Sequence, residues 1–326
     1  MKLDTSMSNV KRYGIVVVIV VLMIFGASVT QSALLRNCHS LNVFRNVLPL
    51  SQMIWFEWEQ GRVESARINQ LKSEVGAVVT VRWLLRGATL QWQTRQSETL
   101  ELLLDEIVQH GWISLLDSPQ RVQAAFYLTD ITLAQPGWSI AERQIRLNKA
   151  LFFSSDYPDA LALKGIYLAQ SGQLESGRAL VLDALAIAKE RKNVGVIHIG
   201  KYYQSEKTDP ARAGEAWIWM RMGQFQANIG QLQDAEQSLL YSLNLHSENA
   251  WGLDAMASVL IRQGDCSEAI PYARLAVSGG KNAANFRLHL ADAYWCAGSK
   301  SEAREIYRGI VSENPIYLDA LRERLR

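Results

Sequence analysis

Three stretches near the C-terminus share one pattern: GQLQDAEQSLLYSL from Gly230, GDCSEAIPYARLAV from Gly264 and GSKSEAREIYRGIV from Gly298. The first residues of successive stretches are 34 positions apart in both intervals. A constant period of this length is typical of stacked helix pairs, in which each pair buries an apolar face against the next. The sequence therefore predicts an array of helical hairpins.

Small residues recur in these units where two helices must cross closely. They stand eight and twenty places into each unit, at Gly223, Ala257, Ala291, Ala235, Ala269 and Ala303. Larger side chains would keep the helix axes from approaching to roughly 8–10 Å. We therefore assign these residues to packing and to no active site.

Together with Ala276, Tyr307 and Pro315 at places 27, 24 and 32, this pattern resembles the tetratricopeptide repeat (TPR) family. An earlier copy fits the same register, with Pro158, Gly165, Gly172, Gly177 and Ala184. The resemblance implies an all-α, right-handed solenoid of helical hairpins that binds partner proteins without catalysis of its own. We expect the TPR array to cover residues 158–326.

The spacing is irregular upstream of Gly230. Gly172 and Gly230 are 58 residues apart, so the segment from about Lys189 to Arg212 is an insertion or a lengthened helix pair. Residues 55–157 are predicted to form divergent, repeat-like hairpins, with an unrelated helical cap as the alternative. AVVTVRW from Ala77 is the one β-like run, and we expect it to start a buried helix.

The N-terminus contains a long uncharged segment. Residues 13–35 carry no charged side chain, and a helix of this length spans about the 30 Å of a bilayer core. We expect a transmembrane helix at residues 14–35, a cytoplasmic tail at 1–13 and a juxtamembrane segment at 36–54; a cleaved secretory signal is the alternative. Lys2, Lys11 and Arg12 before the span favour a cytoplasmic N-terminus. The predicted localisation is thus the cell membrane, single-pass, with the helical domain outside the cytoplasm.

Charge and motifs exclude several functions. Of 34 Lys and Arg and 32 Asp and Glu, three basic residues and one acidic residue precede residue 36, which leaves 31 of each. A neutral remainder argues against a nucleic-acid partner. The five histidines are scattered, and no phosphate-loop, dinucleotide-binding, zinc-protease or Cys-x-x-Cys motif occurs. We predict no enzymatic activity, no metal, no cofactor and no small-molecule substrate.

Two cysteines fall in neighbouring repeats. Cys266 and Cys296 both lie near inter-helix turns on one edge of the predicted array. They form either a disulfide that links two repeats or two buried thiols.

The TPR resemblance also implies where a partner binds. In that family the first helices of the pairs line a concave groove, which would receive a peptide or a helix. The corresponding residues, our hypothetical partner-binding groove, are Trp217, Met220, Gln224, Asn228, Trp251, Asp254, Arg262, Asn285, Leu288, Asp292 and Trp295. Burial of the tryptophans between repeats is the alternative interpretation.

The function predicted from the anchor and the repeats is a membrane-anchored scaffold that binds proteins and helps to assemble or recruit a cell-envelope complex. Two alternatives stay open. One is a stable accessory subunit of an energy-transducing or transport complex in the membrane. The other is a helper of envelope polysaccharide enzymes.

Overall fold

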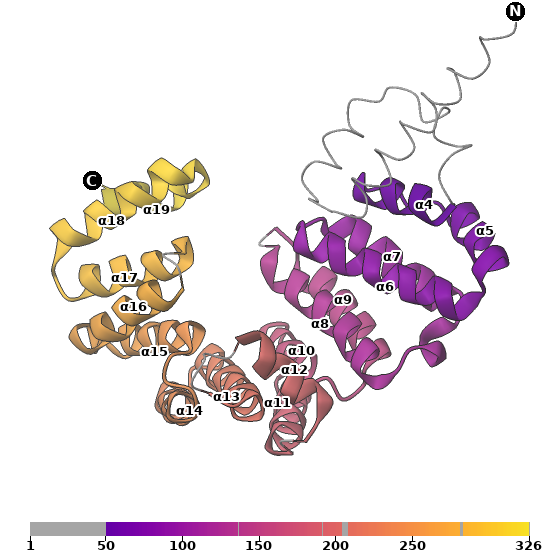
Figure 1. Cartoon of the computed structure of the whole chain (residues 1–326). Coiled ribbons are helices and arrows are strands. Elements are labelled where there is room, and N and C mark those ends of the chain that lie inside the picture. Colours follow the sequence, from indigo (N-terminus) through magenta and orange to yellow (C-terminus); the bar gives the residue numbers. More distant parts are fainter. Residues whose placement is uncertain (1–49, 136, 191, 204–207, 281–282, 326) are drawn as a thin grey trace, which may run out of the picture. The chain divides into compact units, whose positions relative to one another are not determined.

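The computed structural model of the protein describes residues 50–135, 137–190, 192–203, 208–280 and 283–325, and every regular element in these ranges is a helix (Figure 1). The chain divides into two compact units, residues 1–57 and 58–326. Of the first unit, the described residues belong to helix α4 (Leu50–Glu59), which continues into the second unit.

The N-terminal part of the second unit contains pairs of packed helices. They are α5 (Ser65–Val75), α6 (Ala77–Gln93), α7 (Ser97–Gln109), the short 3-10 helix η1 (Trp112–Leu115), α8 (Ser118–Ala134) and α9 (Ile140–Phe153). Helix α6 packs on α7, and α8 packs on α9. The β-like run from Ala77 is the start of α6, as expected, and it places Val81, Leu84 and Leu85 in the core.

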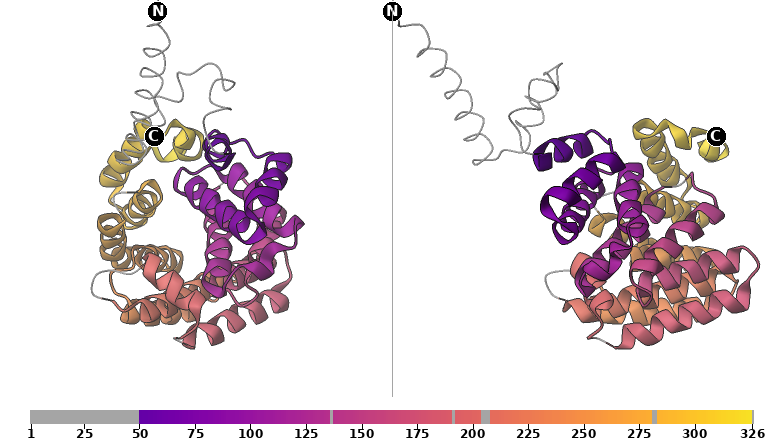
Figure 2. Two further views of the ribbon diagram at one scale, coloured as in Figure 1. Left: turned by 45° about the vertical axis from the view of Figure 1, so that its right-hand side comes forward. Right: turned by 90° about the vertical axis from the view of Figure 1, so that its right-hand side faces the viewer.

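Four hairpins with the predicted turns follow along the chain (Figure 2). Their helices are α10 (Pro158–Gln170) with α11 (Leu174–Lys189), α13 (Pro210–Asn228) with α14 (Leu232–Leu245), α15 (Ala250–Gln263) with α16 (Cys266–Gly279), and α17 (Ala284–Cys296) with α18 (Lys300–Glu313). The last three hairpins also contact one another in sequence, through α14 with α15 and α16 with α17. This arrangement confirms an all-α, TPR-like helical repeat fold for the part of the chain that the structure describes.

The glycine between the two helices of each hairpin has a backbone conformation that other residues rarely adopt. Gly172, Gly230, Gly264 and Gly298 have φ angles of 84°, 82°, 93° and 87°. Side chains with a Cβ atom are disfavoured at such positive angles, whereas glycine is not. The residue that marks the period in the sequence is therefore the one that allows the chain to reverse direction.

The irregular spacing after Gly172 is caused by an extra helix. Helix α12 (Val194–Tyr203) lies between α11 and α13 in the sequence and packs on both α13 and α8. The segment around 189–212 is thus an insertion, and the helices of the neighbouring hairpins keep ordinary lengths of 13 to 19 residues.

The last helices of the chain share a small cluster of buried residues. After α18 come the 3-10 helix η2 (Pro315–Tyr317) and helix α19 (Leu318–Leu325). Leu321 of α19 packs with Ala291, Ala303 and Tyr307, all buried, and Trp295 is one of the partly buried side chains packed against this cluster. Pro315 ends the last hairpin, as the sequence indicates.

The predicted localisation needs correction. Within the described ranges, no helix is both long enough and apolar enough to pass through a bilayer, for which roughly 20 apolar residues are required. The predicted span at 14–35 lies outside the described residues. No described helix therefore supports the assignment as a single-pass membrane protein with an extracytoplasmic helical domain, and we withdraw that localisation.

Candidate protein-binding surface

The predicted groove residues on α13 are largely inaccessible. Trp217 is 2% exposed and Met220 is fully buried. Gln224 is half-buried and accepts a hydrogen bond of 3.0 Å from Arg221, while Asn228 is exposed and lies 3.5 Å from the side chain of Gln170. A partner could therefore reach Asn228, but neither the indole of Trp217 nor Met220.

Helix α12 is the element that covers this part of α13. The ring of Tyr203 stacks on Trp217, with 3.6 Å between the ring centroids and 10° between their planes. Gly200 and Gly214 allow the two helices to approach, since an added Cβ on Gly200 would lie 1.6 Å from the carbonyl oxygen of Pro210. The insertion thus occupies the space that the repeat pattern alone assigns to a ligand.

A buried ion pair lies beside the same tryptophan. Arg221 Nε donates to Asp159 Oδ1 of α10 at 2.7 Å, and both side chains are at most 5% exposed. The guanidinium also lies 4.9 Å from the ring centroid of Trp217. Burial lowers the pKa of Arg221, but the charge and hydrogen bond of Asp159 outweigh this effect, so the net shift is upward. The two charges neutralise each other inside the protein, so neither is available to a ligand.

Sequence reasoning missed this ion pair. Asp159 and Arg221 are 62 residues apart. One signal was available in the sequence: Arg221 stands between two apolar residues, Met220 and Met222. Since charged side chains are rarely buried unless they are paired, a buried Arg221 would need an acidic partner.

Near the N-terminal end of α15, a predicted groove residue is exposed to solvent. Trp251 is 45% exposed, and its ring meets Phe286 of α17 edge-on at 5.0 Å. Asn285 and Leu288 of α17 are half-buried, and Arg262 at the end of α15 is exposed. Helices α15 and α17 contact each other, and we call Trp251, Arg262, Asn285 and Leu288 on these two helices the α15/α17 face.

A histidine of α17 forms a polar contact with an aspartate of α15. His289 Nδ1 lies 2.7 Å from Asp254 Oδ1, and Asp254 is 7% exposed. Burial lowers the pKa of His289, but the hydrogen bond and charge of Asp254, together with the charge of Asp292, outweigh it, so the pKa is raised. Asp254 is therefore part of a polar contact between neighbouring first helices, and only a small fraction of it is accessible.

Asp292 and Trp295 lie next to the C-terminal core. The hydroxyl of Tyr307 donates to Asp292 Oδ1 at 2.5 Å, and burial, together with this interaction, raises the pKa of Tyr307 above its ordinary value. Trp295 is half-buried, and its ring is approached by three basic side chains of α18 and α19.

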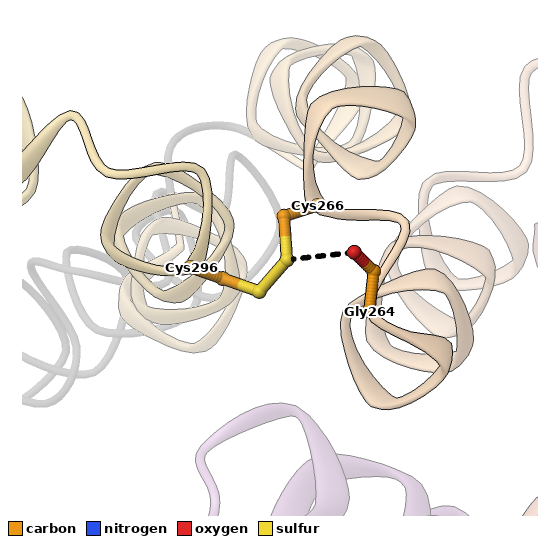
Figure 3. The surroundings of a disulfide bond; sticks show 3 residues. All are labelled: Gly264, Cys266 and Cys296. Carbon is orange, nitrogen blue, oxygen red and sulfur yellow. Dashed lines mark hydrogen bonds between the residues drawn. A yellow bond between two sulfur atoms is a disulfide. The ribbon is translucent and has the colours of Figure 1, made fainter.

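The two cysteines named above lie beside the hairpin turns (Figure 3). The structure joins Cys266 and Cys296 as a disulfide, with 5.5 Å between their Cα atoms, and Cys266 Sγ lies 3.3 Å from the carbonyl oxygen of Gly264. The bond connects the start of α16 with the end of α17, two elements that pack on each other.

No group of three or more His, Cys, Asp and Glu side chains that could hold a metal ion occurs among the described residues.

Comparison with known proteins supplies no family assignment. No protein-family model matches the chain, and no curated protein matches it. A solved TPR protein from Parabacteroides merdae is 14% identical, with a TM-score of 0.49 over 85% of this chain and 96% of that one.

Two further solved structures are similar over a smaller share of the chain. YrrB, described as a TPR protein with an unusual peptide-binding site, is 13% identical with a TM-score of 0.36, and the match covers 68% of this chain and 96% of YrrB. The MamA protein is 14% identical with a TM-score of 0.32, over 61% and 95% of the two chains. All three TM-scores lie below 0.5, so the evidence for the repeats is in the hairpins of the chain itself.

Proposed function

We propose that the protein is a protein-binding scaffold whose partner docks on the α15/α17 face, and which helps to assemble a complex by holding that partner. The observation that carries the proposal is the exposure of Trp251, whose ring contacts Phe286 on the helix that also contains the half-buried Asn285 and Leu288. Tryptophan is enriched among the residues that contribute most of the binding energy at protein interfaces.

The contrast with α13 sharpens the proposal. Trp217 and Trp251 occupy the same place in successive 34-residue units, yet the first is 2% exposed and the second 45%. Helix α12 covers Trp217, whereas no helix in the described part of the chain covers Trp251 to a similar degree. This difference in exposure supports a binding surface on the later repeats.

The test is the recovery of binding partners by affinity-purified protein from a native extract, identified by mass spectrometry. Trp251→Ala should reduce recovery of a specific partner by about tenfold or more, because truncated interface anchors commonly cost 2 kcal/mol or more. Leu275→Ala on the second helix α16 is the matched control, since Leu275 is 57% exposed and lies outside the α15/α17 face. Equal recovery with both variants would contradict the proposal.

A further inference from the structure

Three cations gather around one tryptophan at the C-terminal end. Lys300 Nζ lies 5.3 Å from the ring centroid of Trp295, Arg304 Cζ lies 5.6 Å from it and Arg324 Cζ lies 4.7 Å from it. Lys300 and Arg304 belong to α18, and Arg324 belongs to α19. We call these four residues the Trp295 cluster.

The positive charge of this cluster is not neutralised within the described part of the chain. None of its three cations forms an ion pair there, whereas nearby Arg287 pairs with Glu313 and Arg322 pairs with Asp319. Arg304 Nε is also buried without a hydrogen-bond acceptor. A buried donor without a partner is costly, and an acceptor supplied by a ligand would remove that cost.

Asp292, which belongs to the same helix as Trp295, is already engaged with other side chains. It accepts the hydrogen bond of Tyr307 and acts on His289. The electrons of the indole ring attract cations and hold them close together, but they do not cancel the charge. The cluster therefore attracts an anion.

We propose that the Trp295 cluster binds carboxylate side chains of an acidic peptide segment in a protein partner. The proposal rests on the proposed protein-binding function and names the chemistry of the partner. A nucleic acid fits less well, because residues 36–326 carry as many acidic as basic residues. Arginine forks pair with carboxylates through two parallel hydrogen bonds, which makes Arg304 and Arg324 the principal contacts.

The experiment measures fluorescence anisotropy of a labelled peptide of alternating Asp and Glu with the full-length protein. A peptide with Asn and Gln at the same positions reports charge-independent binding. We expect the acidic peptide to bind, the neutral peptide to bind at least about tenfold more weakly, and the affinity to fall with added salt. The double variant Arg304→Gln/Arg324→Gln should weaken acidic-peptide binding by about tenfold or more.

A matched control removes the same net charge from the same two helices. Arg308 and Arg322 are exposed residues of α18 and α19 outside the cluster, and Arg308→Gln/Arg322→Gln should change affinity less than about twofold. Equal losses in both double variants, or equal binding of the acidic and neutral peptides, would overturn the proposal. So would cluster-dependent binding of a single-stranded oligonucleotide without binding of the acidic peptide.

The two proposals can fail separately. Loss of peptide binding in Arg304→Gln/Arg324→Gln with normal partner recovery by Trp251→Ala would support the cluster and reject the α15/α17 face. Partner recovery that depends on Trp251, together with no difference between the two peptides, would reject the cluster alone. Helical circular dichroism of each variant must match that of the unaltered protein, since Trp295 covers the C-terminal core.

Discussion

The close packing of α12 on α13 depends on two glycines, Gly200 and Gly214, which have no Cβ atom. A Cβ on Gly214 would lie 2.1 Å from the carbonyl oxygen of Val196, and one on Gly200 would lie 1.6 Å from that of Pro210. Both partners are backbone atoms, which cannot move aside as the end of a flexible side chain can. The contact between these helices therefore requires the absence of a side chain at both positions.

Replacing Gly200 should consequently disrupt the covering of Trp217. We expect Gly200→Ala to lower the free energy of unfolding by about 2–3 kcal/mol or more, because the added methyl group overpacks a tight contact. The measurement is urea unfolding followed by circular dichroism. Gly309→Ala is the control, since a Cβ there meets nothing within 4 Å, and it should stabilise α18 by about 0.5–1 kcal/mol. Equal stability of the two variants would contradict this packing.

His289 should make stability depend on pH in a defined direction. Its pKa in the folded protein is raised by Asp254 and Asp292 against the opposing effect of burial, whereas burial lowers the pKa of His198 and His246. The protonated form of His289 therefore stabilises the fold fully below its unfolded pKa of about 6.5, and this contribution is lost as the pH rises through the folded pKa.

The test separates His289 from the other histidines by difference. The unfolding free energy of the unaltered protein minus that of His289→Gln should be larger at about pH 6 than at about pH 8. His198 and His246 are present in the unaltered protein and in the variant. Their effects on the pH dependence of the unfolding free energy, which are opposite in direction to that of His289, therefore cancel in the difference. A difference that is constant with pH, or one that grows as the pH rises, would show that the pair with Asp254 is not an ionic one.

At the scale of the element, helix starts are specified by short local signals. Asp117 and Gln120 form a reciprocal capping box at the start of α8, and Ser139 and Glu142 form one at the start of α9. The backbone hydrogen bond and the side-chain hydrogen bond of Ser139 lower the pKa of Glu142. Such residues satisfy N–H groups that have no partner within the helix, so they act independently of the rest of the fold.

Loss of one of these caps should have a modest and local cost. We expect Ser139→Ala to destabilise the protein by about 1 kcal/mol, because it removes the acceptor for the N–H of Glu142. Thermal unfolding would measure the effect. Ser312→Ala near the end of α18 is the control, as Ser312 is exposed and bonds only the carbonyl of Gly309 among the described residues, so it should change stability by less than about 0.5 kcal/mol. A larger effect at Ser312 than at Ser139 would contradict the importance of the cap.

At the scale of the whole molecule, distant parts of the sequence are brought together by hairpin stacking. Cys266 and Cys296 are 30 residues apart in sequence and belong to successive hairpins, yet their Cα atoms are 5.5 Å apart. A covalent link between hairpins restricts the unfolded chain, whose entropy of loop closure grows with the length of the loop.

The link should therefore contribute measurably to global stability under oxidising conditions. We expect Cys266→Ser/Cys296→Ser, or reduction of the protein, to lower the free energy of unfolding by roughly 3–4 kcal/mol. Urea unfolding with and without reductant measures this, and Cys38→Ser is the control that leaves the pair intact. Non-reducing peptide mapping identifies the linked pair directly, and free thiols at both positions would refute it.

The sequence by itself determined the repeat fold, because its evidence is local and periodic. Turn glycines with positive φ recur every 34 residues, small residues recur where helices cross, and Pro315 ends the last hairpin. Each of these features is required by the backbone geometry of a single unit, and its recurrence at a constant interval makes the repeat recognisable in the sequence. The same local evidence located the insertion after α11 through the longer interval between Gly172 and Gly230.

Only the tertiary structure decided which of the predicted groove residues are accessible. Trp217 and Trp251 occupy equivalent places in their repeats, but α12 buries the first and leaves the second exposed. The pairing of Arg221 with Asp159, and the gathering of Lys300, Arg304 and Arg324 around Trp295, likewise join separate helices. Exposure and charge balance depend on what packs against a residue from elsewhere in the chain, and a repeat pattern contains no information about that.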